Sequence, residues 1–184
     1  MCTISKVSVA IAAFGMSAGV AAADKYGFGT APTEMELKMA VFAWPADGRN
    51  LPPGKGTYEE GKSVYAEKCS ACHGQSLEGI PKPGVGGDKL IGGRGSLVGG
   101  KPVKTIESYW PYATTIFDYV KRAMPFNAPG SLSDNEVYAV TAFILGEANI
   151  IEKNQVIDAK SLPTIEMPNR NGFIPDPRPD VRNY

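Results

Sequence analysis

The sequence predicts an all-α domain flanked by extended N-terminal and C-terminal segments. Two capping boxes mark helix starts, Thr57 with Glu60 and Ser133 with Glu136, because each pair satisfies backbone N–H groups that the first helical turn leaves unbonded. Apolar residues recur at helical spacing along the stretch that they enclose, and nothing indicates a sheet. The regular structure is therefore expected within residues 57–150.

The first predicted helix covers residues 57–69, TYEEGKSVYAEKC. Val64 and Tyr65 lie one turn past Gly61, and the helix ends on a cysteine. A glycine-rich stretch, residues 74–101, follows and is expected to be a loop.

The second predicted helix starts at Pro111 and ends at Met124, because Pro125 disfavours helical geometry in the residue before it. Its core-facing residues are expected to share one side: Ile116, Tyr119, Val120 and Ala123.

The third predicted helix follows Ser133, and Gly146 is expected to help end it. Its apolar positions repeat at intervals of three and four: Val137, Val140, Thr141, Ile144 and Leu145.

The first 23 residues have the features of a secretory signal peptide. Lys6 gives a weakly positive start, an apolar run spans residues 7–20, and Ala21–Ala23 matches an A-x-A cleavage site. The run is too short and too rich in small residues to cross a bilayer comfortably. We therefore predict export to the periplasm, cleavage after Ala23 and no membrane span in the mature protein.

The remaining chain divides into three predicted parts. Residues 24–56 form an N-terminal extension, residues 57–150 form the helical domain, and residues 151–184 form a proline-rich C-terminal extension. The C-terminal extension is either a strap packed on the domain or a docking arm. Without Lys6, 18 of the 19 basic side chains remain against 19 acidic ones. The mature chain therefore has no net positive charge that would attract nucleic acid.

The chemistry of the sequence is concentrated in Cys69-Ser-Ala-Cys72-His73. A structural zinc site needs four ligands, and no second cysteine or histidine cluster supplies them. A thioredoxin-like pair expects a βαβ context, which an all-α chain lacks. The spacing matches a c-type haem attachment site, in which Cys69 and Cys72 form thioethers with one haem and His73 binds its iron.

The second axial ligand follows by elimination, because His73 is the only histidine. The methionines of the mature chain are Met35, Met39, Met124 and Met167. Met124 is preferred because it ends a helix and is held extended by Pro125. Met35 and Met39 suit packing, and Met167 lies in the proline-rich tail. A thioether in the sixth position raises the reduction potential and leaves no open site for oxygen, so we expect electron transfer.

The sequence resembles a class I cytochrome c over residues 57–150. The resemblance rests on Gly61-x-x-Val64-Tyr65 entering CSACHG, on MPF at 124–126 and on AVTAFIL in the last helix. It implies the class I cytochrome c fold around one covalent haem, with Gly61 letting the first helix cross the last one near Phe143.

Four further stretches are similar to the cytochrome subunit of Sox-type sulfane (sulfite) dehydrogenases: GGRGSL, KPVKTIESYWPYATTIFDYVKRAMPF, LSDNEVYAVTAFIL and MPNRNGFIPDPRPDV. The similarity implies a molybdenum-cofactor dehydrogenase subunit as partner. It makes Arg94, Tyr109 and Trp110 candidates to hydrogen-bond the haem propionates. The alternative for Arg94 is a position in a solvated loop, and the alternative for Trp110 is packing in the core. It also implies a proline carbonyl, of Pro81 or Pro83, as acceptor for the His73 N–H.

These expectations together describe a periplasmic monohaem cytochrome c, not catalytic alone. It would carry electrons from a molybdenum sulfite, sulfane or thiosulfate dehydrogenase to the respiratory chain, through a downstream cytochrome or oxidase. The alternative is a general periplasmic electron shuttle or the haem subunit of another dehydrogenase.

Overall fold

The computed structural model describes residues 30–39, 43–81 and 86–177. The predicted signal peptide and its cleavage site lie outside these residues. The chain divides into two units, 1–41 and 42–184, and the first contributes one described helix, α1 (Glu34–Met39). The second unit contains α2 (Tyr58–Lys68), α3 (Ser70–His73), α4 (Ile106–Tyr109), α5 (Ala113–Ala123) and α6 (Asp134–Glu147). It also contains β1 (Lys55–Gly56), β2 (Ile157–Asp158) and the 3-10 helices η1 (Ser96–Val98) and η2 (Leu162–Thr164).

Both predicted capping boxes are confirmed, and each sets the start of a long helix. The Thr57 hydroxyl accepts from the Glu60 N–H, while the Glu60 carboxylate accepts from the Thr57 N–H at 2.8 Å. Ser133 and Glu136 repeat this arrangement ahead of α6. The all-α prediction holds for the fold, because the only strands among the described residues form a two-residue ladder.

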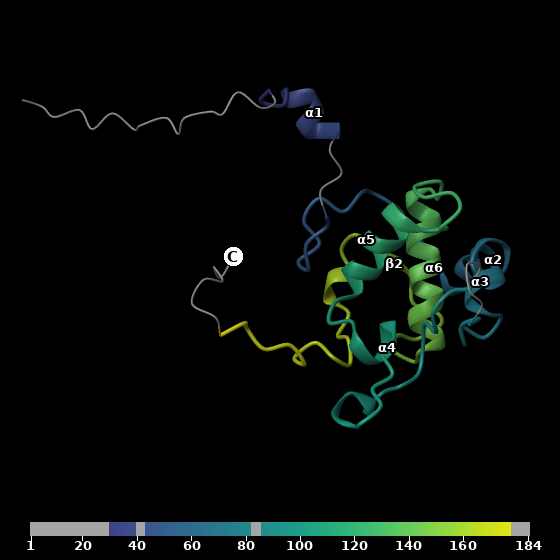
Figure 1. The fold of residues 1–184 in the computed structure, drawn as a ribbon. Helices are drawn as coiled ribbons and strands as arrows, with labels where there is room; N and C mark the ends of the chain where they lie inside the picture. The colour runs from purple at the N-terminus through teal and green to yellow at the C-terminus, as the bar shows by residue number, and fades with distance from the viewer. Residues whose placement is uncertain (1–29, 40–42, 82–85, 178–184) are drawn as a thin grey trace, which may run out of the picture. The chain divides into compact units, whose positions relative to one another are not determined.

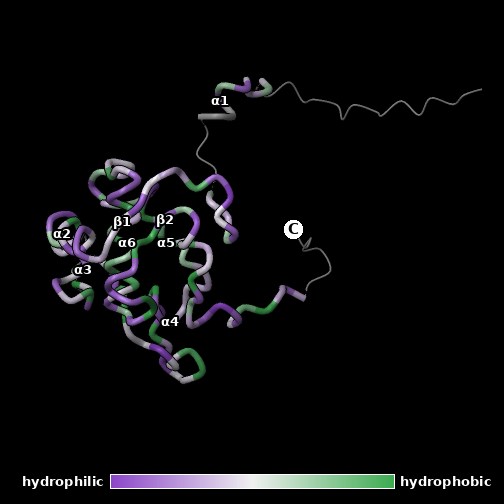
Figure 2. Tube along the Cα trace, turned by 180° about the vertical axis from the view of Figure 1, so that it is seen from behind, coloured by the Kyte–Doolittle hydropathy of each residue, from purple (hydrophilic) through white to green (hydrophobic). Residues whose placement is uncertain are grey.

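Helix α6 is the centre of the second unit, as Figure 1 shows. It is buried on all sides from Val137 to Gly146 and lies between α5 and α2. Figure 2 shows the tube of α2 mostly in hydrophilic colours, whereas α6 contains an unbroken run of four apolar residues at 142–145. Burial of such apolar surface is the main stabilising contribution to the fold.

The crossing of α2 over α6 depends on Gly61, as expected from the family resemblance. A Cβ placed on Gly61 would lie 1.9 Å from the Ala139 carbonyl oxygen and 2.8 Å from the Phe143 Cβ. The rings of Tyr58 and Tyr65 pack on either side of this contact, with centroids 5.2 Å and 5.1 Å from that of Phe143. The two backbones are therefore in direct contact near the start of α2.

Gly146 lies in the last turn of α6, which ends one residue later at Glu147, and its carbonyl accepts from the N–H of Ala148. A Cβ at Gly146 would lie 2.7 Å from Cδ2 of Tyr58. The glycine therefore makes room for an aromatic ring from α2.

Helix α5 starts at Ala113, two residues after Pro111, and ends before Met124 as predicted. Its buried face differs from the prediction at two positions. Tyr119 is 47% exposed and packs edge-on against Trp110, and Ala123 is only half-buried. The buried positions are Ala113, Thr114, Ile116, Phe117, Asp118 and Val120. The short helix α4, which carries Tyr109, was not predicted; it starts at a third capping box, between Thr105 and Ser108.

The C-terminal extension packs on the domain through its first half. β2 pairs antiparallel with β1, with Gly56 opposite Ile157. The side chains that it adds to the core are almost fully buried: Ile157, Leu162, Ile165 and Met167. Residues 170–177 are exposed. As far as Met167, the C-terminal extension is therefore a strap packed on the domain.

Candidate haem-binding site

The cysteines and the histidine lie on one tight turn at the end of α2. That helix ends at Lys68, one residue before the predicted end, because Cys69 leaves helical geometry and α3 begins after it. The Cys69 carbonyl accepts from the N–H groups of both Cys72 (3.1 Å) and His73 (3.0 Å). The two thiols, both free and partly exposed, and the imidazole are thus fixed on one short segment.

The His73 ring has one nitrogen held and one left available. Its Nδ1 lies 2.7 Å from the backbone carbonyl oxygen of Asp88. A carbonyl oxygen can only accept, so Nδ1 carries the proton and Nε2 keeps its lone pair for a metal. The acceptor is therefore Asp88 and not Pro81, while Pro83 lies outside the described residues.

The loop that supplies this carbonyl is tied to the cysteine–histidine turn by further backbone hydrogen bonds. Gly87 N–H donates to the Cys72 carbonyl at 2.8 Å, and Gly79 N–H donates to the His73 carbonyl at 2.8 Å. Ile80 N–H in turn donates to the Gly87 carbonyl at 3.0 Å. The loop and the turn that carry the imidazole are therefore joined by several backbone hydrogen bonds, and metal-binding histidines in general are oriented by hydrogen bonds of neighbouring groups.

The cysteines do not have the character of a redox pair. Burial, and secondarily the nearby Cys72 sulfur, raises the pKa of the Cys69 thiol to about 11. A reactive disulfide-exchange cysteine needs the opposite shift, since the thiolate is the nucleophile. The Cys69 thiol is thus neutral in this environment, which suits a group that is to be joined to a cofactor.

Met124 is partly buried and packs against the hydrophobic core at the end of α5. Its backbone is extended, with φ −121° and ψ 150°, as predicted from the following proline. The other methionines are placed differently. Met167 is buried in the core at 2% exposure, Met35 is 71% exposed in the first unit, and the Met39 side chain is outside the description.

Several apolar side chains from separate segments are packed on the core yet only partly covered. They come from α2, the loop after α3, the α4–α5 connection and the end of α5: Val64, Cys69, Leu90, Ile91, Trp110 and Met124. Apolar walls with a few polar groups are typical of cofactor sites. Together with the free thiols and the available Nε2 of His73, this residue set fits a covalently attached haem.

The three predicted propionate donors, Arg94, Tyr109 and Trp110, differ in whether their donor groups already have hydrogen-bond partners. Among the described residues, neither the Trp110 indole N–H nor the Tyr109 hydroxyl has a hydrogen-bond partner. Arg94 already donates to Glu107 (2.9 Å) and to the Ala148 carbonyl (2.8 Å). Propionate binding stays a prediction for all three, and Trp110 and Tyr109 have the freer donors.

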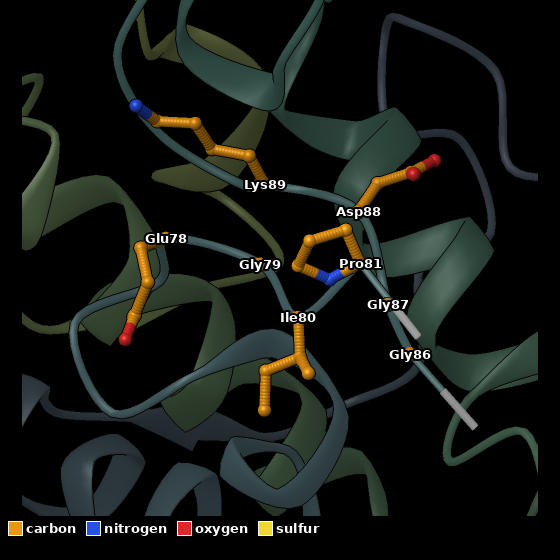
Figure 3. A pocket seen from close by; sticks show the side chains of 8 residues that line it. All are labelled: Glu78, Gly79, Ile80, Pro81, Gly86, Gly87, Asp88 and Lys89. Atoms are coloured by element: carbon orange, nitrogen blue, oxygen red, sulfur yellow. The ribbon is translucent and has the colours of Figure 1, made fainter. Parts of the chain in front are cut away.

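A hollow of about 480 Å³ lies beside the loop that contacts His73. Figure 3 shows its lining, in which the side chains of Glu78, Asp88 and Lys89 point away from one another. Most of the remaining lining is glycine backbone: Gly79, Gly86 and Gly87, with Ile80 and Pro81. Such a lining does not suit an apolar macrocycle.

Among the described residues, no group of three or more histidine, cysteine, aspartate or glutamate side chains is placed to hold a metal ion. No helix in that part of the chain is long and apolar enough to cross a bilayer.

A helical domain with a Cys-x-x-Cys-His turn, an oriented histidine and a partly covered apolar wall has the features of a cytochrome c domain. The sequence model of the family described as cytochrome c oxidase, cbb3-type, subunit III, matches residues 56–144. A solved chain in the crystal structure of the sulfane dehydrogenase SoxCD from Paracoccus pantotrophus is 39% identical, with a TM-score of 0.73. The match covers 85% of this chain and 75% of that one. The chain therefore belongs to the class I c-type cytochromes and is a relative of that SoxCD chain.

Two thiosulfate dehydrogenases are also similar. The protein from Stutzerimonas stutzeri (strain A1501) is 30% identical over 116 residues, which is 62% of this chain and 34% of the relative. That from Psychrobacter arcticus (strain DSM 17307 / VKM B-2377 / 273-4) is 29% identical over 104 residues, or 53% and 28%. The chain thus spans about a third of the length of these curated relatives.

Proposed function

We propose that this chain is an exported monohaem cytochrome c that carries electrons from a molybdenum-containing sulfur-compound dehydrogenase to the respiratory chain. The observation that carries the proposal is the extent of the likeness to the SoxCD chain. It covers 85% of 184 residues, about 156, whereas a generic cytochrome c domain would account only for residues 57–150. Much of the flanking extensions is therefore shared with a sulfane dehydrogenase.

Each site residue has a distinct role in this proposal. The Cys69 and Cys72 thiols would hold a haem through two thioethers, and His73 would bind its iron through Nε2 because Nδ1 donates to Asp88. The Met124 sulfur would be the other axial ligand. A haem bound there would supply a one-electron ferric/ferrous couple.

The proposed ligands also favour electron transfer over catalysis with oxygen or peroxide. A soft thioether favours the ferrous state, and two protein ligands leave no open coordination position for oxygen or peroxide. Among the described residues the Trp110 indole N–H and the Tyr109 hydroxyl have no hydrogen-bond partner, so they would be available to negatively charged propionates. The sulfur chemistry would therefore occur in a partner, for which we propose the molybdenum-cofactor subunit, with a downstream cytochrome or oxidase as acceptor.

Rapid mixing tests this function. Oxidised protein is mixed anaerobically with the molybdenum dehydrogenase of the same organism, with and without sulfite or thiosulfate, while haem reduction is followed optically. We expect reduction at the turnover rate only when enzyme and substrate are both present. Absence of reduction, with a normal methionine-ligated spectrum, would refute this donor.

A general electron shuttle is the second candidate, and one observation favours it. The cytochrome c oxidase family model matches residues 56–144, the part of the chain that any class I cytochrome c would share. A shuttle would accept electrons from several unrelated donors at comparable rates, so the same mixing experiment with a second dehydrogenase separates the two candidates.

A further inference from the structure

A glycine that no sequence pattern singled out lies against the His73 ring. A Cβ built on Gly87 would lie 2.7 Å from both Cε1 and Nδ1 of His73, and 3.0 Å from Nε2. Ordinary van der Waals contact begins at 3.4 Å. The loop backbone therefore lies directly against the imidazole, including the nitrogen available to a metal.

Gly87 cannot move away from the ring independently of the other contacts. Its N–H is bound to the Cys72 carbonyl, and its own carbonyl accepts from Ile80. The next residue, Asp88, supplies the carbonyl that holds Nδ1 at 2.7 Å. Any separation of the loop and the ring must therefore stretch the Nδ1–Asp88 hydrogen bond.

We propose that Gly87 is a positioning residue for the axial histidine, and that its missing side chain sets both the ring position and the strength of the Nδ1–Asp88 hydrogen bond. This inference rests on the proposed role of His73 as iron ligand. A hydrogen bond donated by Nδ1, the ring nitrogen that does not bind the iron, makes the imidazole a stronger electron donor. A stronger donor stabilises ferric iron. Gly87 thereby holds the reduction potential below the value that a freely held histidine would give.

The test compares Gly87→Ala with Gly100→Ala, both as haem-loaded protein. Gly100 is a matched control because it belongs to the same glycine-rich stretch and a Cβ there would meet nothing within 4 Å. In a redox titration we expect the potential of Gly87→Ala to shift upward and that of Gly100→Ala to stay at the wild-type value. The His73 Nδ1–H resonance of the ferrous protein should also shift in Gly87→Ala, reporting a weaker hydrogen bond.

Nuclear Overhauser contacts in the wild-type ferrous protein provide a test that needs no variant. We expect cross-peaks between the Gly87 α-protons and the His73 ring protons. Their absence would overturn the proposal even if Gly87→Ala fails to accumulate. A Gly87→Ala protein with unchanged potential and unchanged Nδ1–H resonance would overturn it as well. Failure of His73 to bind a haem iron is distinguishable, since the wild type itself would then lack a histidine-ligated c-type haem spectrum. Failure of the proposed donor would show only in the mixing experiment with the dehydrogenase.

Discussion

The substitution Gly61→Ala tests the helix crossing that positions the site. The new methyl carbon would lie 1.9 Å from the Ala139 carbonyl oxygen, and a backbone atom cannot rotate away. Overpacking costs about 1–3 kcal/mol, and the backbone neighbour places this case at the upper end, about 3 kcal/mol. Alanine regains about 1 kcal/mol of helix propensity over glycine, which leaves a net loss of about 2 kcal/mol.

Thermal unfolding of the haem-loaded protein, followed by circular dichroism, measures this loss. For a domain of this size about 4 °C is lost per kcal/mol, so we expect the Tm to fall by about 8 °C. Gly100→Ala, which adds a methyl group in open space, should leave the Tm unchanged. A Gly61→Ala protein that melts at or above the wild-type temperature would refute the close contact of α2 and α6.

Two further predictions concern the axial ligand and the acid limit of stability. Met124→Leu should lower the reduction potential and abolish the far-red charge-transfer band of methionine-ligated ferric haem, whereas Met167→Leu, in the core, should keep both. Survival of the band in Met124→Leu would exclude Met124. Hydrogen bonds from Lys68 and Ser133 lower the pKa of Glu136 to about 2 from 4.5. Its contribution to stability is therefore complete above pH 4.5 and lost as the pH falls through about 2. Glu136→Gln should flatten the acid limb of the stability profile in urea titrations, and an unchanged limb would contradict this assignment.

Local signals in the sequence predicted the helix starts correctly, because a capping box is complete within four residues. Thr57 with Glu60 and Ser133 with Glu136 form the predicted bonds. The end of α5 before Pro125 follows from the same kind of short-range constraint. The close approach at Gly61, in contrast, was expected from family resemblance, since no local pattern indicates which helix a glycine will face.

Features that depend on distant residues were not predictable in this way. Helical spacing placed Tyr119 on the core face, but Trp110 holds its ring at the surface. The pairing of β1 with β2 joins Gly56 to Ile157, and two-residue strands carry no periodic signal.

For His73, the family resemblance predicted a backbone carbonyl as acceptor but not the residue that supplies it. The histidine itself is recognisable from its motif, but its acceptor is a backbone carbonyl, which every residue has. Asp88 therefore carries no side-chain signature of this role, and Gly87 contributes by having no side chain at all. Only a glycine-rich stretch close to the histidine could have drawn attention to that loop.

Mass spectrometry of the purified protein under denaturing conditions tests the central claim most directly. The protein is produced in a host that attaches haem to exported cytochromes. The account predicts a polypeptide heavier by the mass of one haem, with the addition mapped to the peptide containing Cys69 and Cys72. A polypeptide of unmodified mass, or one whose haem separates on denaturation, would contradict it.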